Sequence, residues 1–221
     1  MDALIKINGS DKLDDRTKKS VATKIKYVSD GVAEVERIAG LKYPAYFVEP
    51  VLTVTESNDN IGGLGVLYAR TIPVETGGKV HIVVQLTAPL VLLATKATIK
   101  LVLAHEFLHY LELVRSFVRL DLTSELTANT IFEERYADSL RAIDPSKVFS
   151  KSKKLVRDLK NKTSAGLEDE KLNEKCRLKW IEKGLPMAKI PIASNQIRVS
   201  VSSIVSSSFD DAVRDFVLKL G

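Results

Sequence analysis

The chain has 221 residues, of which 45% are hydrophobic and 28% charged, so it can build a globular core. This length suits one compact domain with an appendage, or two small domains. Cys176 is the only cysteine, which excludes a disulfide framework and a cysteine-based zinc site, and we expect a cytoplasmic protein. No hydrophobic run approaches the roughly 20 residues of a membrane helix. The first residues do not resemble a secretory signal, so no membrane contact is expected.

The formal net charge of +5 is unevenly distributed along the chain. Residues 1–145 contain 17 Lys and Arg against 19 Asp and Glu, a charge of −2, whereas residues 146–221 contain 16 against 9, a charge of +7. We therefore expect a nearly neutral domain over 1–145 and a basic C-terminal extension or small domain over 146–221. Such a basic segment is typical of proteins that contact nucleic acid, and also of ordinary solvated helices.

The hydrophobic pattern predicts an α+β fold. Apolar residues at three- and four-residue steps predict a helix over 14–39. Turn residues then separate short β-rich segments, which favours a small, mostly antiparallel sheet. Two further helices are expected, the second ending before Pro145. The predicted strands lie within 46–55, 64–74 and 79–87, the two helices at about 95–120 and 125–143, and the extension contains helices at 151–162 and 171–184, a β-like segment at 196–205 and a short final helix.

Two of the three histidines lie in the sequence His105-Glu106-Phe107-Leu108-His109. On a helix, residues four positions apart share a face, so both imidazoles can bind one metal ion. Zinc suits two imidazoles and a carboxylate, with a water molecule in the fourth position. Glu106 lies about 100° around the helix from His105, within reach of that water, and can accept its proton. The pattern predicts a hydrolytic zinc site with Glu106 as general base.

The third ligand is expected to be acidic, because no histidine follows His109. Glu134 and Asp138 lie four residues apart within the predicted helix 125–143, so they share a face. Glu134 would bind the metal, and Asp138 would accept the free ring N–H of a ligating histidine. Glu133 is the competing ligand, on another face of the helix. We favour Glu134, because the residue four positions after Glu133 is Ala137, which cannot accept a hydrogen bond through its side chain.

The segments "HEFLH" and "ERYAD" resemble the motifs of the gluzincin branch of zinc metallopeptidases, the thermolysin-like group. The order of helix, small sheet, active-site helix and glutamate helix is similar to that of minigluzincin catalytic domains, over about residues 15–145. The resemblance implies a zincin-like fold and Zn²⁺ held by His105, His109 and Glu134. It further implies Glu106 as general base, Asp138 as the partner of a ligand, and cleavage of a peptide or protein substrate.

Two further expectations depend on this resemblance. Thermolysin-like enzymes use a downstream histidine to stabilise the transition state, and this chain has no clear equivalent, so Tyr110 and Tyr136 are candidate substitutes. In zincins a strand like 79–87 forms the upper edge of the cleft, and an extended peptide adds to it through main-chain hydrogen bonds. His81 lies on that strand and is a candidate cleft residue, although a surface or half-buried histidine is the simpler interpretation.

The segment "KWIEKGLPMAKI" (179–190) is loosely similar to the turn after the recognition helix in small winged-helix or excisionase-like DNA-binding modules. This similarity and the charge of +7 support an alternative function, a zinc-binding, nucleic-acid-associated protein in which residues 146–221 make the main contacts. The competing interpretation makes Trp180 a core anchor, because a tryptophan buries more apolar surface than any other side chain.

Overall fold

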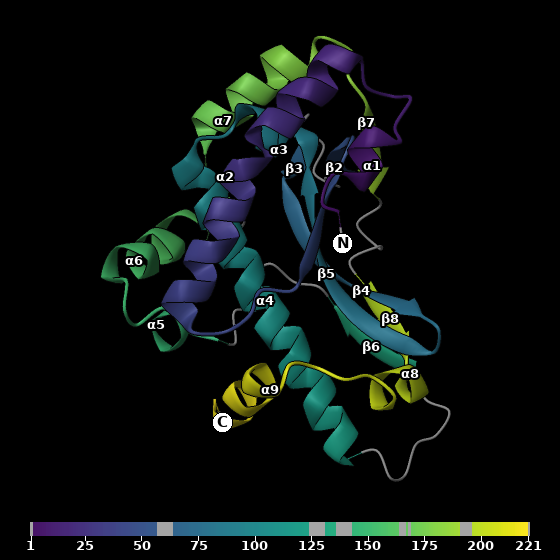
Figure 1. Cartoon of the computed structure of the whole chain (residues 1–221), viewed down its shortest axis with the longest axis vertical. Coiled ribbons are helices and arrows are strands. Elements are labelled where there is room, and N and C mark those ends of the chain that lie inside the picture. Colours follow the sequence, from purple (N-terminus) through teal and green to yellow (C-terminus); the bar gives the residue numbers. More distant parts are fainter. Residues whose placement is uncertain are drawn as a thin grey trace.

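The structure is a computed structural model that describes residues 2–56, 64–123, 131–135, 143–163, 167, 169–190 and 196–220. For residues 55, 56, 64, 65, 121–123, 131–135, 190 and 196–198 it describes the backbone only. Helices and short strands are mixed along the chain, so the predicted α+β class is confirmed (Figure 1).

The helices are α1 (Ile5–Asn8), α2 (Asp15–Ala39), α3 (Ala88–Leu93), α4 (Lys96–Thr123), α5 (Pro145–Val148), α6 (Lys153–Lys162), α7 (Glu170–Cys176), α8 (Val201–Val205) and α9 (Asp211–Lys219). Helix α7 continues as the π-helical turn η2 (Arg177–Ile181). The strands are β1 (Ala45–Glu49), β2 (Leu52–Glu56), β3 (Leu64–Leu67), β4 (Ala69–Thr76), β5 (Lys79–Thr87), β6 (Ile131–Arg135), β7 (Met187–Ile190) and β8 (Gln196–Ser200).

The two long helices α2 and α4 lie side by side (Figure 1). Helix α2 begins at Asp14, whose carboxylate accepts a hydrogen bond from the backbone N–H of Thr17, and ends at Gly40 in the left-handed conformation. Gly31, in the middle of α2, is buried against α4, and a Cβ atom there would lie 2.7 Å from Cδ1 of Leu103. The glycine therefore costs helix propensity but lets the two helices approach closely.

The described strands form three sheets rather than the single, mostly antiparallel sheet that we predicted. The first has the order β1-β5-β4, with β1 parallel and β4 antiparallel to β5. The second has the order β3-β2-β7, and β7 is parallel to β2. The segment 64–74 is divided at Tyr68 because the chain leaves β3 in one sheet and enters β4 in the other. Short turns correctly predicted the β4–β5 hairpin, where Gly77 and Gly78 both have positive φ.

The predicted helix over 125–143 is wrong for residues 131–135, which form strand β6. This strand pairs antiparallel with β8, from Ile131 opposite Ser200 to Arg135 opposite Gln196. The partner strand is more than 60 residues away in sequence, so local periodicity could not indicate it. The predicted β-like segment 196–205 is correct only in its first half, because residues 201–205 turn into α8.

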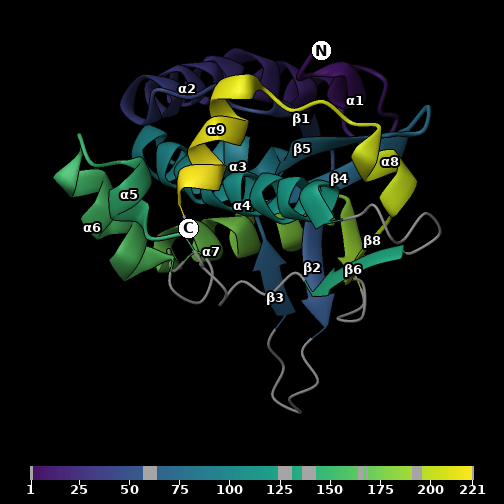
Figure 2. The same cartoon turned by 90° about the horizontal axis from the view of Figure 1, so that it is seen from below.

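Residues 146–221 share one hydrophobic cluster with residues 1–145. Leu159, Trp180 and Val213 are fully buried members of this cluster, together with Leu103 and Phe117 of α4. Helix α9 lies against α4 (Figure 2), and β7 pairs with β2 and extends its sheet. In the described parts of the chain, the basic segment after residue 145 therefore has no separate hydrophobic core of its own. Among the described helices, none has the length and apolar character needed to cross a membrane.

Candidate metal centre

Helix α4 carries the motif residues toward the β4–β5 hairpin and is fixed there by contacts along its length. The hydroxyl of Tyr43 donates a hydrogen bond to the carbonyl oxygen of Leu103, at 3.0 Å. The ring of Phe107 stacks on the ring of Tyr43 with centroids 5.5 Å apart. Phe107 is fully buried, so the helix cannot rotate about its axis without breaking the core. This packing determines which side of α4 presents the two histidines.

The imidazoles of His105 and His109 converge on one point. Their Nε2 atoms are 3.1 Å apart, and the two rings are nearly perpendicular, at 87°. Two ligands placed 2.0–2.1 Å from a tetrahedral zinc ion are about 3.3 Å apart, so the observed separation fits two ligands of one ion. The same separation suits an N–H···N hydrogen bond between neutral imidazoles, which a metal ion would replace. The prediction that the two histidines share a face is confirmed.

Glu106 lies against the neighbouring strand β4. The Thr71 hydroxyl lies 2.8 Å from Oε2 of Glu106 and 3.0 Å from the Glu106 carbonyl oxygen. It can therefore donate its single proton to either acceptor. Both residues are buried, Thr71 completely and Glu106 to 4% exposure. The sequence analysis missed Thr71, because it lies in a β-rich segment without a motif and is brought to Glu106 only by the packing of β4 on α4.

The structure places His81 away from these residues. Strand β5 lies between β1 and β4, so the expectation that it forms the edge of a cleft is wrong, and β4 is the outer strand of the described sheet. Thr71 pairs with Val84, so Thr71 and Val84 lie on the same face of the sheet. Side chains alternate along a strand, and His81, three residues before Val84, lies on the opposite face and is exposed. The structure does not bring His81 and Glu106 together.

Tyr110 is the described candidate for transition-state stabilisation. It follows His109 directly and is buried, with its ring packed against Phe107 at a centroid distance of 5.8 Å. Burial raises the pKa of Tyr110 to about 12, and the negative charge of Asp210, just before α9, adds to this shift. Tyr110 therefore stays a neutral hydroxyl at physiological pH. The second candidate, Tyr136, lies outside the described residues, as does Asp138.

The two candidate third ligands lie in β6, opposite Arg198 and Ile197 of β8. Glu133 pairs with Arg198 and Glu134 pairs with Ile197, and the structure describes only their backbone. Our preference for Glu134 used the four-residue spacing of a helix, which does not apply where the chain is a strand. Among the side chains that the structure describes, no His, Cys, Asp and Glu form a group of three suited to a metal. Glu133 and Glu134 thus remain competing predictions.

Trp180 in the basic extension is a core residue. It has no exposed surface, and its ring N–H donates a hydrogen bond to the carbonyl oxygen of Pro186, at 2.9 Å. The interpretation of Trp180 as a core anchor is therefore confirmed. Because the indole is enclosed, it offers no ring surface on which a nucleobase could stack.

The chain matches no protein-family model, no curated protein and no solved structure. The resemblance to gluzincins thus depends on the motif residues at 105–109 and 134–138. A functional assignment therefore depends on the arrangement of His105, Glu106 and His109, and on the strand that carries Thr71.

Proposed function

We propose that the protein is a zinc-dependent metallopeptidase of the gluzincin type, with a zincin-like core. The observation that carries the proposal is the 3.1 Å separation of the two histidine Nε2 atoms beside the buried carboxylate of Glu106. A pair of histidines with a purely structural role has no need of an adjacent carboxylate. Here His105 and His109 would hold Zn²⁺, and Glu134, or the competing Glu133, would complete the ligand set.

A bound zinc ion would supply Lewis-acid activation of a water molecule and of the scissile carbonyl group. The residues of this chain would then position and transfer protons. Glu106 would accept the proton of the attacking water at its carboxylate and pass it to the nitrogen of the leaving amine. The hydrogen bond from Thr71 would orient that carboxylate, because it holds Oε2. The neutral hydroxyl of Tyr110 would serve as a hydrogen-bond donor to the negative charge that develops on the scissile group.

The position of β4 supports a peptide or protein substrate. This strand is hydrogen-bonded to β5 along one side and ends the described order β1-β5-β4. An extended peptide can add to the outer strand of a sheet through main-chain hydrogen bonds. Since Thr71 of β4 contacts Glu106, a peptide aligned along β4 would lie close to the general base. Strand β4 therefore takes the role that we first assigned to the strand at 79–87.

Substitution of Glu106 tests this proposal, with Glu112 as a matched control on the same helix. Glu112 forms an ion pair with Arg115 and plays no part in the proposed chemistry. Glu106→Gln keeps the shape of the side chain but removes the base, so hydrolysis of a peptide library should fall by about 10²- to 10⁴-fold. Zinc content should stay at one ion per chain, and Glu112→Gln should hydrolyse peptides like the wild type. Unchanged hydrolysis in Glu106→Gln would refute the role of this carboxylate.

A further inference from the structure

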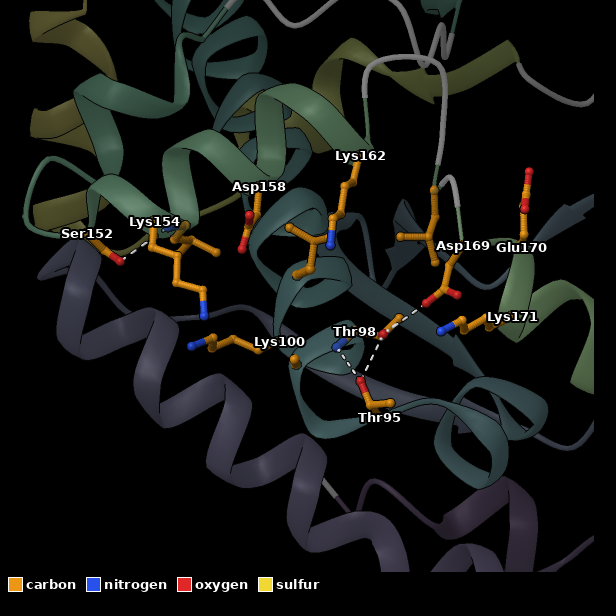
Figure 3. Close-up of a pocket in the computed structure, with 14 residues that line it drawn as sticks. Thr95, Thr98, Lys100, Ser152, Lys154, Asp158, Lys162, Asp169, Glu170 and Lys171 are labelled. Carbon is orange, nitrogen blue, oxygen red and sulfur yellow. Dashed lines mark hydrogen bonds between the residues drawn. The ribbon is translucent and has the colours of Figure 1, made fainter.

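A cavity of about 620 Å³ lies between the start of α4, the length of α6 and the start of α7 (Figure 3). This volume is within the range of roughly 300–1,000 Å³ that is typical of small-molecule sites. Its apolar floor includes Leu101 and Leu155, which are almost fully buried. Its walls carry hydroxyl groups and four lysines, Lys100, Lys154, Lys162 and Lys171. The cavity therefore combines a hydrophobic surface with several cationic groups.

The four lysines line the cavity from α4, α6 and α7, and Figure 3 shows Lys162 and Lys171 directed into it and Lys100 directed toward α2. Lys100 forms an ion pair with Glu34, at 3.2 Å. Within the described part of the chain, Lys154, Lys162 and Lys171 have no carboxylate within the 4 Å of an ion pair. Three cationic side chains that line one concave surface without an acidic partner repel one another, and a bound anion would relieve this repulsion.

The acidic residues of the cavity compensate only part of this charge. Asp169 already accepts hydrogen bonds from the backbone N–H of Leu172 and from the hydroxyl of Thr98. The carboxylate of Glu170 points away from the centre of the cavity (Figure 3). Asp158 forms an ion pair with Arg157, at 3.9 Å, and Figure 3 shows it between Lys154 and Lys162. The lining has four lysines and three carboxylates, Asp158, Asp169 and Glu170, and so a formal charge of +1.

The orientation of helix α4 adds positive potential at the cavity. Helix α4, 28 residues long, and helix α6, 10 residues long, both begin at the cavity. Their first side chains, Thr95 and Ser152, cap these ends by accepting hydrogen bonds from Thr98 and Leu155. The positive end of the α4 dipole thus lies at the cavity, where it favours a negative ligand, whereas α6 lines the cavity from Ser152 to its last residue, Lys162.

We propose that this cavity binds a small molecule that carries two or more phosphate groups, such as a nucleoside di- or triphosphate. The phosphates would lie among Lys154, Lys162 and Lys171, since lysine binds phosphate as a point charge. The apolar floor at Leu101 and Leu155 would contact the organic part of the ligand, and Asp158 would accept a hydrogen bond from a hydroxyl group. A concave site of this size fits a compact ligand better than a nucleic-acid duplex, which needs an extended cationic surface.

Binding to the full-length chain can be measured by isothermal titration calorimetry with three probes: ATP, inorganic tripolyphosphate and a short DNA duplex. The test variant is Lys154→Ala with Lys162→Ala, which changes two exposed residues of the cavity. Its matched control, Lys147→Ala with Lys151→Ala, removes the same charge from exposed residues nearby that do not line the cavity. We expect ATP and tripolyphosphate to bind the wild type and the control alike, and the test variant at least about tenfold more weakly.

An equal loss of affinity in both double variants would contradict the proposal, because it would show general attraction to a basic surface. The proposal would also be contradicted if tripolyphosphate failed to bind at millimolar concentration. It would likewise be contradicted if the test variant lost affinity for the DNA duplex alone. Asp158→Asn offers a second check, since removal of this negative charge should tighten the binding of tripolyphosphate. None of these measurements depends on zinc or on hydrolysis, so the proposed peptidase function and this site can fail separately.

Discussion

Helix α4 and strand β6 carry the two halves of the proposed metal site, and different interactions hold them in place. In α4 the backbone hydrogen bonds join residues four positions apart. The helix is also held by hydrogen bonds from Tyr43 and Thr71 and by its close contact with Gly31. In β6 the backbone bonds reach β8, at the far end of the chain. The geometry of His105 and His109 is therefore a local property, whereas the position of Glu133 and Glu134 depends on how the C-terminal segment packs.

This difference has a consequence for the metal site. The histidine pair is preformed, because their Nε2 atoms already lie at the separation of two zinc ligands. The proposed carboxylate ligand lies in a segment whose pairing partner belongs to residues 146–221. The basic C-terminal part thus contributes to the proposed site indirectly, through β8, rather than as an independent module.

The largest expected effect is the loss of zinc from His105→Ala. Removal of an imidazole that binds the ion should weaken zinc binding by more than the roughly 10- to 100-fold typical of residues that only contact a ligand. His81→Ala is the matched control, because it removes the chain's third histidine from the opposite face of the sheet. Competition with a chelator measures both affinities. Equal zinc affinity in the two variants would mean that α4 does not hold the metal.

The second prediction distinguishes the two carboxylates of β6. Either Glu134→Gln or Glu133→Gln should weaken zinc binding by about 100-fold, and the other should have little effect. The same chelator competition provides the measurement, with far-ultraviolet circular dichroism as a control for folding. If neither substitution changes zinc affinity, the third ligand lies elsewhere in the chain.

The third prediction concerns the hydrogen bond between β4 and α4. Thr71→Val removes a donor to the carboxylate and carbonyl of Glu106, and should lower the free energy of unfolding by about 2 kcal/mol. Thr71→Ser keeps the hydroxyl and should lose less. Urea denaturation gives both values. If the zinc-loaded protein hydrolyses peptides as proposed, Thr71→Val should also lower kcat, and Thr71→Ser should restore it. A Val variant as stable and active as the wild type would show that Thr71 does not hold Glu106.

The smallest expected effect is that of Gly31→Ala, for which two terms oppose each other. A Cβ atom would lie 2.7 Å from Leu103, and such overpacking costs about 1–3 kcal/mol, whereas replacing glycine in a helix gains about 1 kcal/mol. We expect a net loss of roughly 1 kcal/mol in stability. Gly9→Ala is the control, because its Cβ atom would meet only the Ile5 carbonyl oxygen at an ordinary 3.4 Å. A stabilised Gly31→Ala protein would show that α2 and α4 do not need this close contact.

The same contrast explains which features the sequence could predict. Helices α2, α4, α6 and α9 follow the apolar spacing, because their stability and register are set by neighbours three and four residues away. The shared face of His105 and His109 follows from the same geometry. The sheets could not be predicted to the same extent, since β1–β5, β2–β7 and β6–β8 each join segments that are distant in sequence. Thr71 could not be recognised for the same reason, because its role depends on β4 packing against α4.

The central claim is that His105 and His109 hold one zinc ion beside Glu106. Anomalous diffraction from crystals of the zinc-loaded protein, recorded on both sides of the zinc absorption edge, tests this claim most directly. We predict a single anomalous peak per chain within about 2.1 Å of both Nε2 atoms, next to the carboxylate of Glu106. A peak elsewhere in the chain, or no peak between the two imidazoles, would contradict the proposed metal centre.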